Sequence, residues 1–369
     1  MKISCQELAE SCTLCGVCAE VCPFFKATGN IKYGAMEKVD AARRLFKGER
    51  LGDEDLKTLM LCTRCDQCHA SCPINIPISE IVQGARAELR RLKMVPEKYN
   101  TIADSIINKG SPMGTPPEKR RDVLPEGFSP PEKAKCLYVA GCWAGIKLQD
   151  AARASIELLR KAGVDFTFLA EKEWCCGLFL IDTGMMNEVK ALAEKNTLLF
   201  EATGAEKVIT ECPSCYDVFK EVYPKLFRAP KYEVVHMSAF LKELIAEGRL
   251  KVNRRERRII YKEPCPLVRR YGITEEPRDI LKRIGTLLEY DENRTETLCC
   301  GAPAGVKPLY PDIANVLARM LLDEAEAKKA DLIGVNCAFC EYHMAGACAD
   351  QAKAARIKTM SQLVLDSLD

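Results

Sequence analysis

The sequence predicts an α/β C-terminal region of two duplicated domains, each a parallel sheet with flanking helices, preceded by a mainly helical module. Three observations lead to this prediction. Strand-like and helix-like segments alternate after residue 134, an order typical of parallel sheets covered by helices. The triplet Cys-Cys-Gly occurs twice, at residues 175–177 and 299–301. Two further cysteine runs lie within residues 12–73, with helix-like patterns around them.

The composition is that of an ordinary globular chain. Its 369 residues, 47% hydrophobic and 29% charged, are enough for two or three domains. The 54 basic and 52 acidic residues give a net charge of +2, and no basic stripe with interleaved aromatic residues is present, so we expect no nucleic-acid partner. No run of 18 apolar residues and no export signal is present. We therefore expect a cytoplasmic protein that contacts a membrane only through a partner.

The N-terminal cysteines occur in two runs with the same spacing. With 21 cysteines in a chain of this length, metal or redox chemistry is favoured over a disulfide framework. Both runs, "CTLCGVCAEVCP" and "CTRCDQCHASCP", follow the pattern C-x2-C-x2-C-x3-C-P, the bacterial ferredoxin pattern in which the fourth cysteine crosses to the other cluster. This predicts two cubane 4Fe-4S clusters, one held by Cys12, Cys15, Cys18 and Cys72 and the other by Cys22, Cys62, Cys65 and Cys68.

A pair of structural zinc sites is the alternative for these runs, since C-x2-C is also a zinc spacing. Zinc has no need of a third closely spaced thiolate or of the following proline, so we favour clusters. His69 lies between two ligands of the second run and is not expected to bind metal, because both clusters already have four thiolates. Helix-like spacing over residues 36–61 and 77–92 completes a helical ferredoxin-like module, residues 1–94.

Residues 95–133 contain prolines that interrupt any regular pattern and are predicted to form a linker or wrapping arm. The first α/β domain, residues 134–250, follows. It has strand-like segments at 135–143, 164–170 and 207–210, and helix-like segments at 150–163 and 187–204. The second domain, residues 251–369, repeats the order with strand-like segments at 257–265 and 331–340 and a helix-like segment at 277–285.

Each α/β domain carries five cysteines in the same frame. The first five-cysteine set is Cys142, Cys175, Cys176, Cys212 and Cys215, and the second five-cysteine set is Cys265, Cys299, Cys300, Cys337 and Cys340. Matching cysteines are 123, 124 or 125 residues apart, which indicates an internal duplication. Most of them follow strands, and ligands of parallel sheets collect at the carboxyl ends of strands. A cubane takes four thiolates, so a fifth requires an opened or unusually ligated cluster.

The alternative for each Cys-Cys-Gly triplet is a vicinal disulfide or a pair of core thiols. Two matched frames favour cluster binding over that alternative. Gly177 and Gly301 would then let the backbone approach a cluster, although a simple turn glycine remains open.

These cysteine frames, preceded by the ferredoxin pattern on one chain, resemble the catalytic subunits of heterodisulfide reductases, in the layout of the D-type subunit. The resemblance covers nearly the whole chain. It implies a noncubane 4Fe-4S cluster in each five-cysteine set and cleavage, between the two clusters, of the disulfide that joins coenzyme M and coenzyme B. In this chain Ala302, Pro303 and Ala304 stand where family members often have a more glycine-rich stretch, so we expect these residues to reshape the pocket, and the identity of the disulfide stays open.

The resemblance implies an oxidoreductase that acts on a disulfide as a subunit of a complex. Related subunits instead relay electrons for flavin-dependent glycolate, lactate or glycerol-3-phosphate dehydrogenases, or belong to membrane complexes of sulfur metabolism. Pure relays often lack some of the ten cysteines, all of which are present here, so disulfide reduction is favoured. No GxGxxG fingerprint follows a strand. A partner, either a flavoprotein or a membrane protein of the cytochrome b type, is therefore expected to exchange the electrons.

Cations near the cysteine loops are candidates for binding an anionic substrate. They are Lys147, Lys172, His236, Arg269 and Arg270. The remaining thiols, Cys5, Cys136 and Cys348, lie outside every frame and are expected to be core or surface residues.

Overall fold

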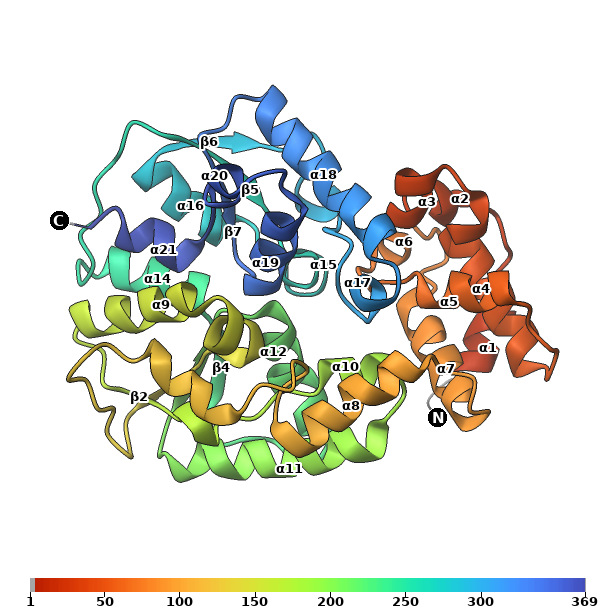
Figure 1. Ribbon diagram of the computed structural model, residues 1–369, viewed down its shortest axis with the longest axis horizontal. Helices are drawn as coiled ribbons and strands as arrows, with labels where there is room; N and C mark the ends of the chain where they lie inside the picture. The colour runs from red at the N-terminus through yellow and green to blue at the C-terminus, as the bar shows by residue number, and fades with distance from the viewer. Residues whose placement is uncertain (1–3, 369) are drawn as a thin grey trace.

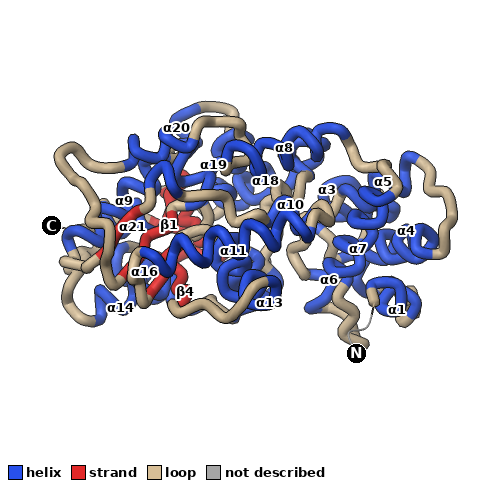
Figure 2. Tube along the Cα trace, turned by 90° about the horizontal axis from the view of Figure 1, so that it is seen from below, coloured by secondary structure: helices blue, strands red, loops and turns tan. Residues whose placement is uncertain are grey.

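The computed structural model describes residues 4–368. The N-terminal module lies at one end of the molecule, and the two α/β domains lie beside each other at the other end (Figure 1). Seen from below, the strands are gathered among helices at one end, whereas the described residues of the N-terminal end form helices and loops without strands (Figure 2). The predicted fold class is therefore confirmed.

The N-terminal module is helical, as predicted. Its core lies mainly between α4 and α7, which bury Val39, Ala42, Ile81 and Val82. The predicted pattern over residues 36–61 is divided between two helices, and Gly48 lies between them with a φ of +81°. The helices are α1 (Cys5–Glu10), α2 (Val17–Glu20), α3 (Pro23–Thr28), η1 (Ile31–Tyr33), α4 (Ala35–Phe46), α5 (Asp53–Met60), α6 (Gln67–Ala70) and α7 (Ile78–Arg91).

The proline-rich segment contains a helix that the sequence reasoning did not expect. α8 (Glu97–Lys109) begins after Pro96, and Gly110 ends it in the left-handed conformation. A proline is compatible with the start of a helix, and a glycine with its end. The expectation that prolines interrupt every regular pattern here is therefore wrong for this stretch. The 3₁₀ helix η2 (Pro117–Val123) follows.

The α8 helix joins two hydrophobic cores. Tyr99 is buried in the core of the N-terminal module, which also includes Val306 and Leu317 of the second α/β domain. Further along the same helix, Ile106 is buried in a core of the first α/β domain. The segment is thus a packed arm rather than a free tether.

The two α/β domains have the same topology. In the first, four parallel strands stand in the order β2-β1-β3-β4, and in the second they stand in the order β6-β5-β7-β8. The strands are β1 (Cys136–Val139), β2 (Phe166–Phe168), β3 (Lys207–Thr210), β4 (Glu233–His236), β5 (Arg258–Lys262), β6 (Thr286–Glu289), β7 (Leu332–Val335) and β8 (Ile357–Thr359).

Helices cover both sheets. Those of the first domain are η3 (Trp143–Lys147), α9 (Gln149–Lys161), η4 (Ala170–Lys172), α10 (Leu178–Asp182), α11 (Met186–Ala202), α12 (Pro213–Asp217), η5 (Val218–Val222), α13 (Tyr223–Leu226) and α14 (Met237–Ala246). Those of the second are α15 (Cys265–Tyr271), α16 (Glu275–Ile284), η6 (Arg294–Glu296), α17 (Val306–Leu309), α18 (Pro311–Ala327), α19 (Ala338–Ala347), α20 (Gln351–Ala354) and α21 (Met360–Leu365).

The two α/β domains pack closely on each other. The Trp143 and Phe339 rings, one from each domain, stack with centroids 4.2 Å apart. The Ser155 hydroxyl of α9 lies 2.8 Å from that of Ser361 in α21, and both residues are buried. A single hydrophobic core runs through both domains at this interface.

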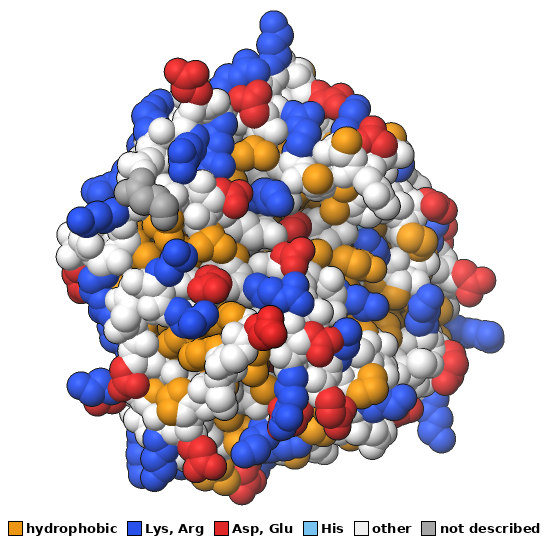
Figure 3. All heavy atoms as spheres, turned by 60° about the vertical axis from the view of Figure 1, so that its left-hand side comes forward, with side chains coloured by type: hydrophobic (Ala, Val, Ile, Leu, Met, Phe, Trp, Pro, Cys, Tyr) orange, Lys and Arg blue, Asp and Glu red, His pale blue; other side chains and the backbone are white. Residues whose placement is uncertain are grey.

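On the face away from the N-terminal module, acidic and basic side chains are interspersed among small apolar patches (Figure 3). This pattern agrees with the near-neutral net charge of +2. Among the residues that the structure describes, no helix is both long and apolar enough to cross a membrane.

We predict that Gly184→Ala destabilises the contact between the N-terminal module and the first α/β domain. Gly184 has a φ of +80°, and an added Cβ would lie 2.3 Å from the Cα of Ala87 in α7. The strained φ and the backbone clash should together lower the free energy of unfolding by about 2 kcal/mol or more, measured by chemical denaturation. Gly204→Ala is the matched control, because φ there is +72° with no atom within 4 Å of the added Cβ. Equal losses in both variants would contradict the clash.

Candidate functional site

The N-terminal thiols form two neighbouring groups that correspond to the two crossed sets. The thiol of Cys18 interacts with those of Cys12, Cys15 and Cys72, and burial together with these thiols raises its pKa to about 11. The structure brings the other crossed set together in the same way. Burial and three neighbouring thiols raise the pKa of Cys68, and these neighbours are Cys65, Cys62 and Cys22.

Backbone conformation explains how each run wraps its thiols into a group. Leu14 and Arg64 occupy matching positions in the two runs, and both have positive φ values, 55° and 54°. Gly16 and Asp66, two residues later, also match, at 86° and 63°. Left-handed residues turn the chain sharply. The two runs therefore fold alike although their intervening side chains differ.

The first five-cysteine set lies at the carboxyl ends of β1, β2 and β3. Cys142 precedes η3, the Cys-Cys pair follows β2, and Cys212 caps the start of α12. The thiols form a chain of contacts in the order Cys142, Cys175, Cys176, Cys215, Cys212. Hydrogen bonds from Cys175 and Cys215 lower the pKa of Cys176 to about 6.

The second five-cysteine set has the same arrangement. Cys265 is the first residue of α15 after β5, and Cys337 caps the start of α19 after β7. Its chain of contacts runs in the order Cys265, Cys299, Cys300, Cys340, Cys337. The Sγ atoms of Cys300 and Cys340 are 3.6 Å apart. The hydrogen bond from Cys299 lowers the pKa of Cys265 to about 6.

The glycine of each triplet serves a turn. Gly177 and Gly301 have φ values of +85° and +92°, and an added Cβ would lie 2.9 Å from Leu192 or from the Ala314 carbonyl oxygen. Their amides point to the first thiol of each pair, at 3.4 Å from Cys175 Sγ and 3.5 Å from Cys299 Sγ. At both glycines the backbone lies close to a neighbouring helix, where a Cβ atom would clash. This favours a turn glycine over a glycine that lets the backbone approach a cluster.

The donor chemistry of all four groups fits iron–sulfur clusters. All 21 cysteines are free thiols, and thiolates are the protein ligands of such clusters. Over residues 4–368, no three cysteine, histidine or carboxylate side chains form a group that could hold a single metal ion. A cluster binds its thiolates through several irons, and each of the four groups supplies four or five of them.

The second five-cysteine set touches the N-terminal module directly. Cys299 contacts Cys65, lowering the pKa of the Cys65 thiol to about 7. The Thr63 hydroxyl oxygen lies 3.3 Å from the Sγ atom of Cys299. Arg269 donates to the Cys65 carbonyl oxygen at 2.7 Å. One group of N-terminal thiols and the second five-cysteine set are therefore neighbours.

An apolar cavity of about 460 Å³ lies between the two α/β domains. All five thiols of the first set line it, together with the aromatic rings of Trp143, Phe339 and Tyr342. The second domain contributes residues 302–305, the loop that follows its Cys-Cys-Gly triplet, while the second five-cysteine set itself is not part of the lining. The alanines and proline of this loop give the cavity part of its apolar wall.

The five candidate cations are not among the residues that line this inter-domain cavity. Lys147 and Lys172 are exposed. His236 is buried, with its ring nitrogens beside the Ser238 hydroxyl and the Glu211 carbonyl oxygen, and burial lowers its pKa to about 4. Arg269 lies beside the second five-cysteine set.

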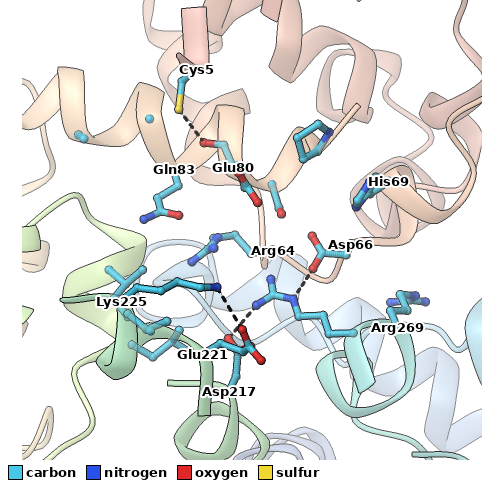
Figure 4. A pocket seen from close by; sticks show the side chains of 18 of the residues that line it. Cys5, Arg64, Asp66, His69, Glu80, Gln83, Asp217, Glu221, Lys225 and Arg269 are labelled. Atoms are coloured by element: carbon cyan, nitrogen blue, oxygen red, sulfur yellow. Dashed lines mark hydrogen bonds and ion pairs between the residues drawn. The ribbon is translucent and has the colours of Figure 1, made fainter. Parts of the chain in front are cut away.

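Arg270 instead lines a cavity where all three parts of the chain meet, and Figure 4 shows this cavity with Asp66 and Asp217 beside it. Its guanidinium forms ion pairs with Asp66 at 2.6 Å and Asp217 at 2.7 Å. His69 also lines this cavity of about 1000 Å³. This arginine thus has a structural role in joining the N-terminal module to the first α/β domain.

The cations that do line the inter-domain cavity are Lys98 and Lys307. Lys98 belongs to α8, within the segment predicted to be a linker, and Lys307 follows the second triplet by six residues. The Nζ atom of Lys307 lies 3.0 Å from Nδ1 of His343 and 4.8 Å from the centre of the Tyr342 ring. Sequence reasoning missed both lysines, because Lys98 lies far from every cysteine in sequence and the direction in which the loop before Lys307 turns cannot be read from the sequence.

Three thiols lie outside the four groups. Cys5 donates to the Glu80 carbonyl oxygen at 3.6 Å, and Cys348 to that of Met344 at 3.4 Å. Cys136 is a buried residue of β1.

Family models match both regions of the chain. A model described as a cysteine-rich domain (CCG) matches residues 136–220 and 259–345, and one described as a 4Fe-4S dicluster domain matches residues 8–76. The D-type subunit of the dihydromethanophenazine:CoB–CoM heterodisulfide reductase of Methanosarcina acetivorans is 31% identical over 361 residues, which cover 91% of this chain and 88% of that protein.

Other relatives carry different names. The B-type subunit of a fumarate reductase (CoM/CoB) from Methanothermobacter marburgensis is 28% identical, covering 90% of this chain and 67% of that protein. An EtfAB:quinone oxidoreductase from Syntrophomonas wolfei is 27% identical, covering 90% of this chain and 54% of that protein. A crystal structure of a hypothetical protein from Helicobacter pylori matches with a TM-score of 0.56 at 12% identity, covering 90% of this chain and 67% of that one, which shows a likeness of fold alone.

We predict that Arg86→Met loosens the loops around the N-terminal thiols. The fully buried guanidinium of Arg86 donates to the carbonyl oxygens of Met60 at 2.8 Å, Cys62 at 2.9 Å and Ala304 at 3.0 Å. Its loss leaves these oxygens without their donor and should lower the free energy of unfolding by about 3 kcal/mol or more, measured by chemical denaturation. Arg91→Met, an exposed arginine on the same helix, should change stability little. A small effect at both positions would contradict the role given to Arg86.

Proposed function

The chain belongs to the family of D-type heterodisulfide reductase subunits, and on that premise we propose that it reduces a disulfide to two thiols at its paired five-cysteine sets. At the coarser level it is an iron–sulfur oxidoreductase subunit that works with partner subunits. The substrate we propose is the disulfide of coenzyme M and coenzyme B or a similar one. The observation that carries the proposal is the apolar cavity that opens onto all five thiols of the first set.

The proposal assigns each group of thiols to one cluster. The crossed N-terminal sets would hold cubane 4Fe-4S clusters, and the two five-cysteine sets would hold noncubane ones. When bound, the clusters supply one-electron transfer, and two of them together match the two electrons that a disulfide requires. The observation that supports this assignment is that the thiols of each of the four sets lie close together.

The overall reaction consumes one disulfide, two electrons and two protons and releases two thiols. The electrons must come from a partner, because the sequence has no dinucleotide fingerprint of its own. We propose a flavoprotein or a membrane protein of the cytochrome b type as that partner. The N-terminal module would receive the electrons and pass them to the second five-cysteine set, which it contacts through Cys65 and Cys299.

The residues of the inter-domain cavity suit an anionic organic disulfide. Trp143, Phe339 and residues 302–305 provide an apolar wall that would exclude water from the sulfur atoms. Lys98 and Lys307 are two cations on this wall, and cations favour carboxylate, phosphate or sulfonate groups through charge-assisted hydrogen bonds. We propose that these lysines bind the charged ends of the substrate.

The second candidate function is an electron-relay subunit of a flavin-dependent dehydrogenase or of a membrane complex of sulfur metabolism. The likeness to an EtfAB:quinone oxidoreductase favours it, since 90% of this chain is matched. A relay needs no substrate sulfur at any cluster, whereas a disulfide reductase does.

Electron paramagnetic resonance on the anaerobically purified chain tests the proposal. The protein is oxidised with coenzyme M, with coenzyme B and with an uncharged thiol such as ethanethiol as a control. We expect a new paramagnetic signal with one of the two coenzymes, broadened when its thiol sulfur is the magnetic isotope. Clusters that behave as simple one-electron carriers with every thiol would instead support the relay.

We predict that Lys307→Met weakens substrate binding. The variant keeps most of the side-chain volume but removes the cation from the cavity wall, so KM for an anionic disulfide should rise about tenfold. The rate is measured anaerobically with an artificial electron donor. Lys147→Met is the control, because that exposed lysine lies outside the cavity lining, and an equal rise in its KM would refute the assignment.

A further inference from the structure

The two five-cysteine sets belong to domains of the same topology. The charged side chains around the two sets differ. Lys262 ends β5 three residues before Cys265, only 1% of it is exposed, and its ammonium group interacts electrostatically with thiols of the second set. Burial lowers its pKa, but the nearby thiols reverse that effect and raise it overall, with Cys265 first and Cys340, Cys300 and Cys299 after it. Arg269 is a second cation with electrostatic contacts to Cys265, Cys65 and Cys299.

The hydrogen bonds of Lys262 and Arg269 go to uncharged oxygen atoms. Lys262 Nζ donates to the Glu263 carbonyl oxygen and lies 3.4 Å from the Thr297 hydroxyl oxygen. Arg269 donates to carbonyl and amide oxygens of Thr295, Thr297, Cys65 and Gln67. Among residues 4–368, neither forms an ion pair with a carboxylate.

The nearest carboxylate in sequence is already committed elsewhere. Glu263 accepts from Arg278 at 2.7 Å and from the Arg294 amide at 2.6 Å. Over the described residues, the two positive charges beside the second five-cysteine set are therefore not paired with a carboxylate, and the thiols of the set are their negatively charged partners.

The first five-cysteine set lacks equivalents of these two cations. Lys98 and Lys307 line the inter-domain cavity with it, but the thiol that interacts electrostatically with Lys307 is Cys300 of the second set. With the duplication offset of 123 residues, the positions of Lys262 and Arg269 correspond to Val139 and Ile146, both apolar. Arg120 lies 4.0 Å from Cys142 Sγ, but the carboxylate of Glu173 is 3.7 Å from its guanidinium. Burial raises the pKa of Glu173, and Arg120 with two backbone amides opposes that rise.

We propose that Lys262 and Arg269 are positioning residues. They give the cluster of the second five-cysteine set a higher reduction potential than the cluster of the first. Reduction adds one negative charge to a cluster, and a fixed cation stabilises that charge most strongly in a buried, weakly screened site. The inference rests on the proposed presence of a cluster in each set. It does not depend on which disulfide is reduced.

This difference in reduction potential determines the order in which electrons occupy the clusters of the two sets. With clusters bound, one electron transferred from the neighbouring N-terminal cluster would oxidise that cluster and reduce the cluster of the second set. A second electron would then reduce the cluster of the first set, which would have the lower potential and whose five thiols line the inter-domain cavity. The stronger reductant is thereby the one that faces the substrate, while the second set stores an electron beside the module that delivers it.

A potentiometric titration of the full chain, with all clusters assembled and signals followed by electron paramagnetic resonance, tests this inference. In Lys262→Met the higher of the two noncubane transitions should move to lower potential by at least about 59 mV, a tenfold change in a one-electron equilibrium. The lower transition should stay in place. Lys262→Arg keeps the charge and should largely restore the wild-type value.

Two further variants keep the test informative. Arg269→Met should lower the same transition, which provides an independent reading if Lys262→Met assembles poorly. Lys38→Met is the matched control: Lys38 is equally buried and lies 3.3 Å from Cys22 Sγ in the N-terminal module, so its loss should move a cubane transition instead.

The possible outcomes separate this inference from the proposed function. Movement of the lower noncubane transition, or no movement in either charge-removing variant, would overturn the inference and leave the proposed function standing. Absence of noncubane signals from the wild-type chain would overturn both. A missing thiol-dependent signal with the predicted shift present would overturn disulfide reduction alone.

Discussion

Parallel strand pairing is the constraint on which the sites of this protein depend. The cysteines of each set come from three loops that are far apart in sequence. Pairing β1 with both β2 and β3 places the three loop starts at one edge, and β5 with β6 and β7 does the same in the second copy. Because side chains at the ends of parallel strands converge, thiols meet without any disulfide or long connection.

The cysteine sites could be predicted because they depend on spacing. Each pattern of cysteines fixes which thiols can meet, and the strands that precede them, such as β1, β3 and β7, have clear apolar runs. β4, β6 and β8 were not predicted, because each contains at most two consecutive apolar residues and no cysteine follows it within three positions. α8 was missed because prolines usually break helices, although a proline before a helix and a glycine after it are compatible with both ends.

Charged residues near the sites were the least predictable part. Lys147 and Lys172 are neighbours of cysteine loops in the chain, yet both side chains are exposed and outside the cavity lining. Lys98 lines the cavity although it belongs to a segment far from the first triplet in sequence. The direction in which a loop turns after a cysteine depends on tertiary packing, and sequence proximity contains no information about that direction. Val139 and Lys262 occupy equivalent positions of the duplication. That one of them places a cation beside its five-cysteine set was not predicted from the sequence.

The packed arm α8 has a consequence for how the molecule can move. Tyr99 is anchored in a core shared by the N-terminal module and the second α/β domain, while Ile106 is anchored in the first. Rotation of one module against another would have to open two cores at once, so hinge motion between them is opposed by the loss of buried apolar surface. Electron tunnelling rates fall steeply with distance. A chain stiffened in this way keeps its redox centres at constant separation, and the supply of electrons does not depend on the modules finding each other anew in every turnover.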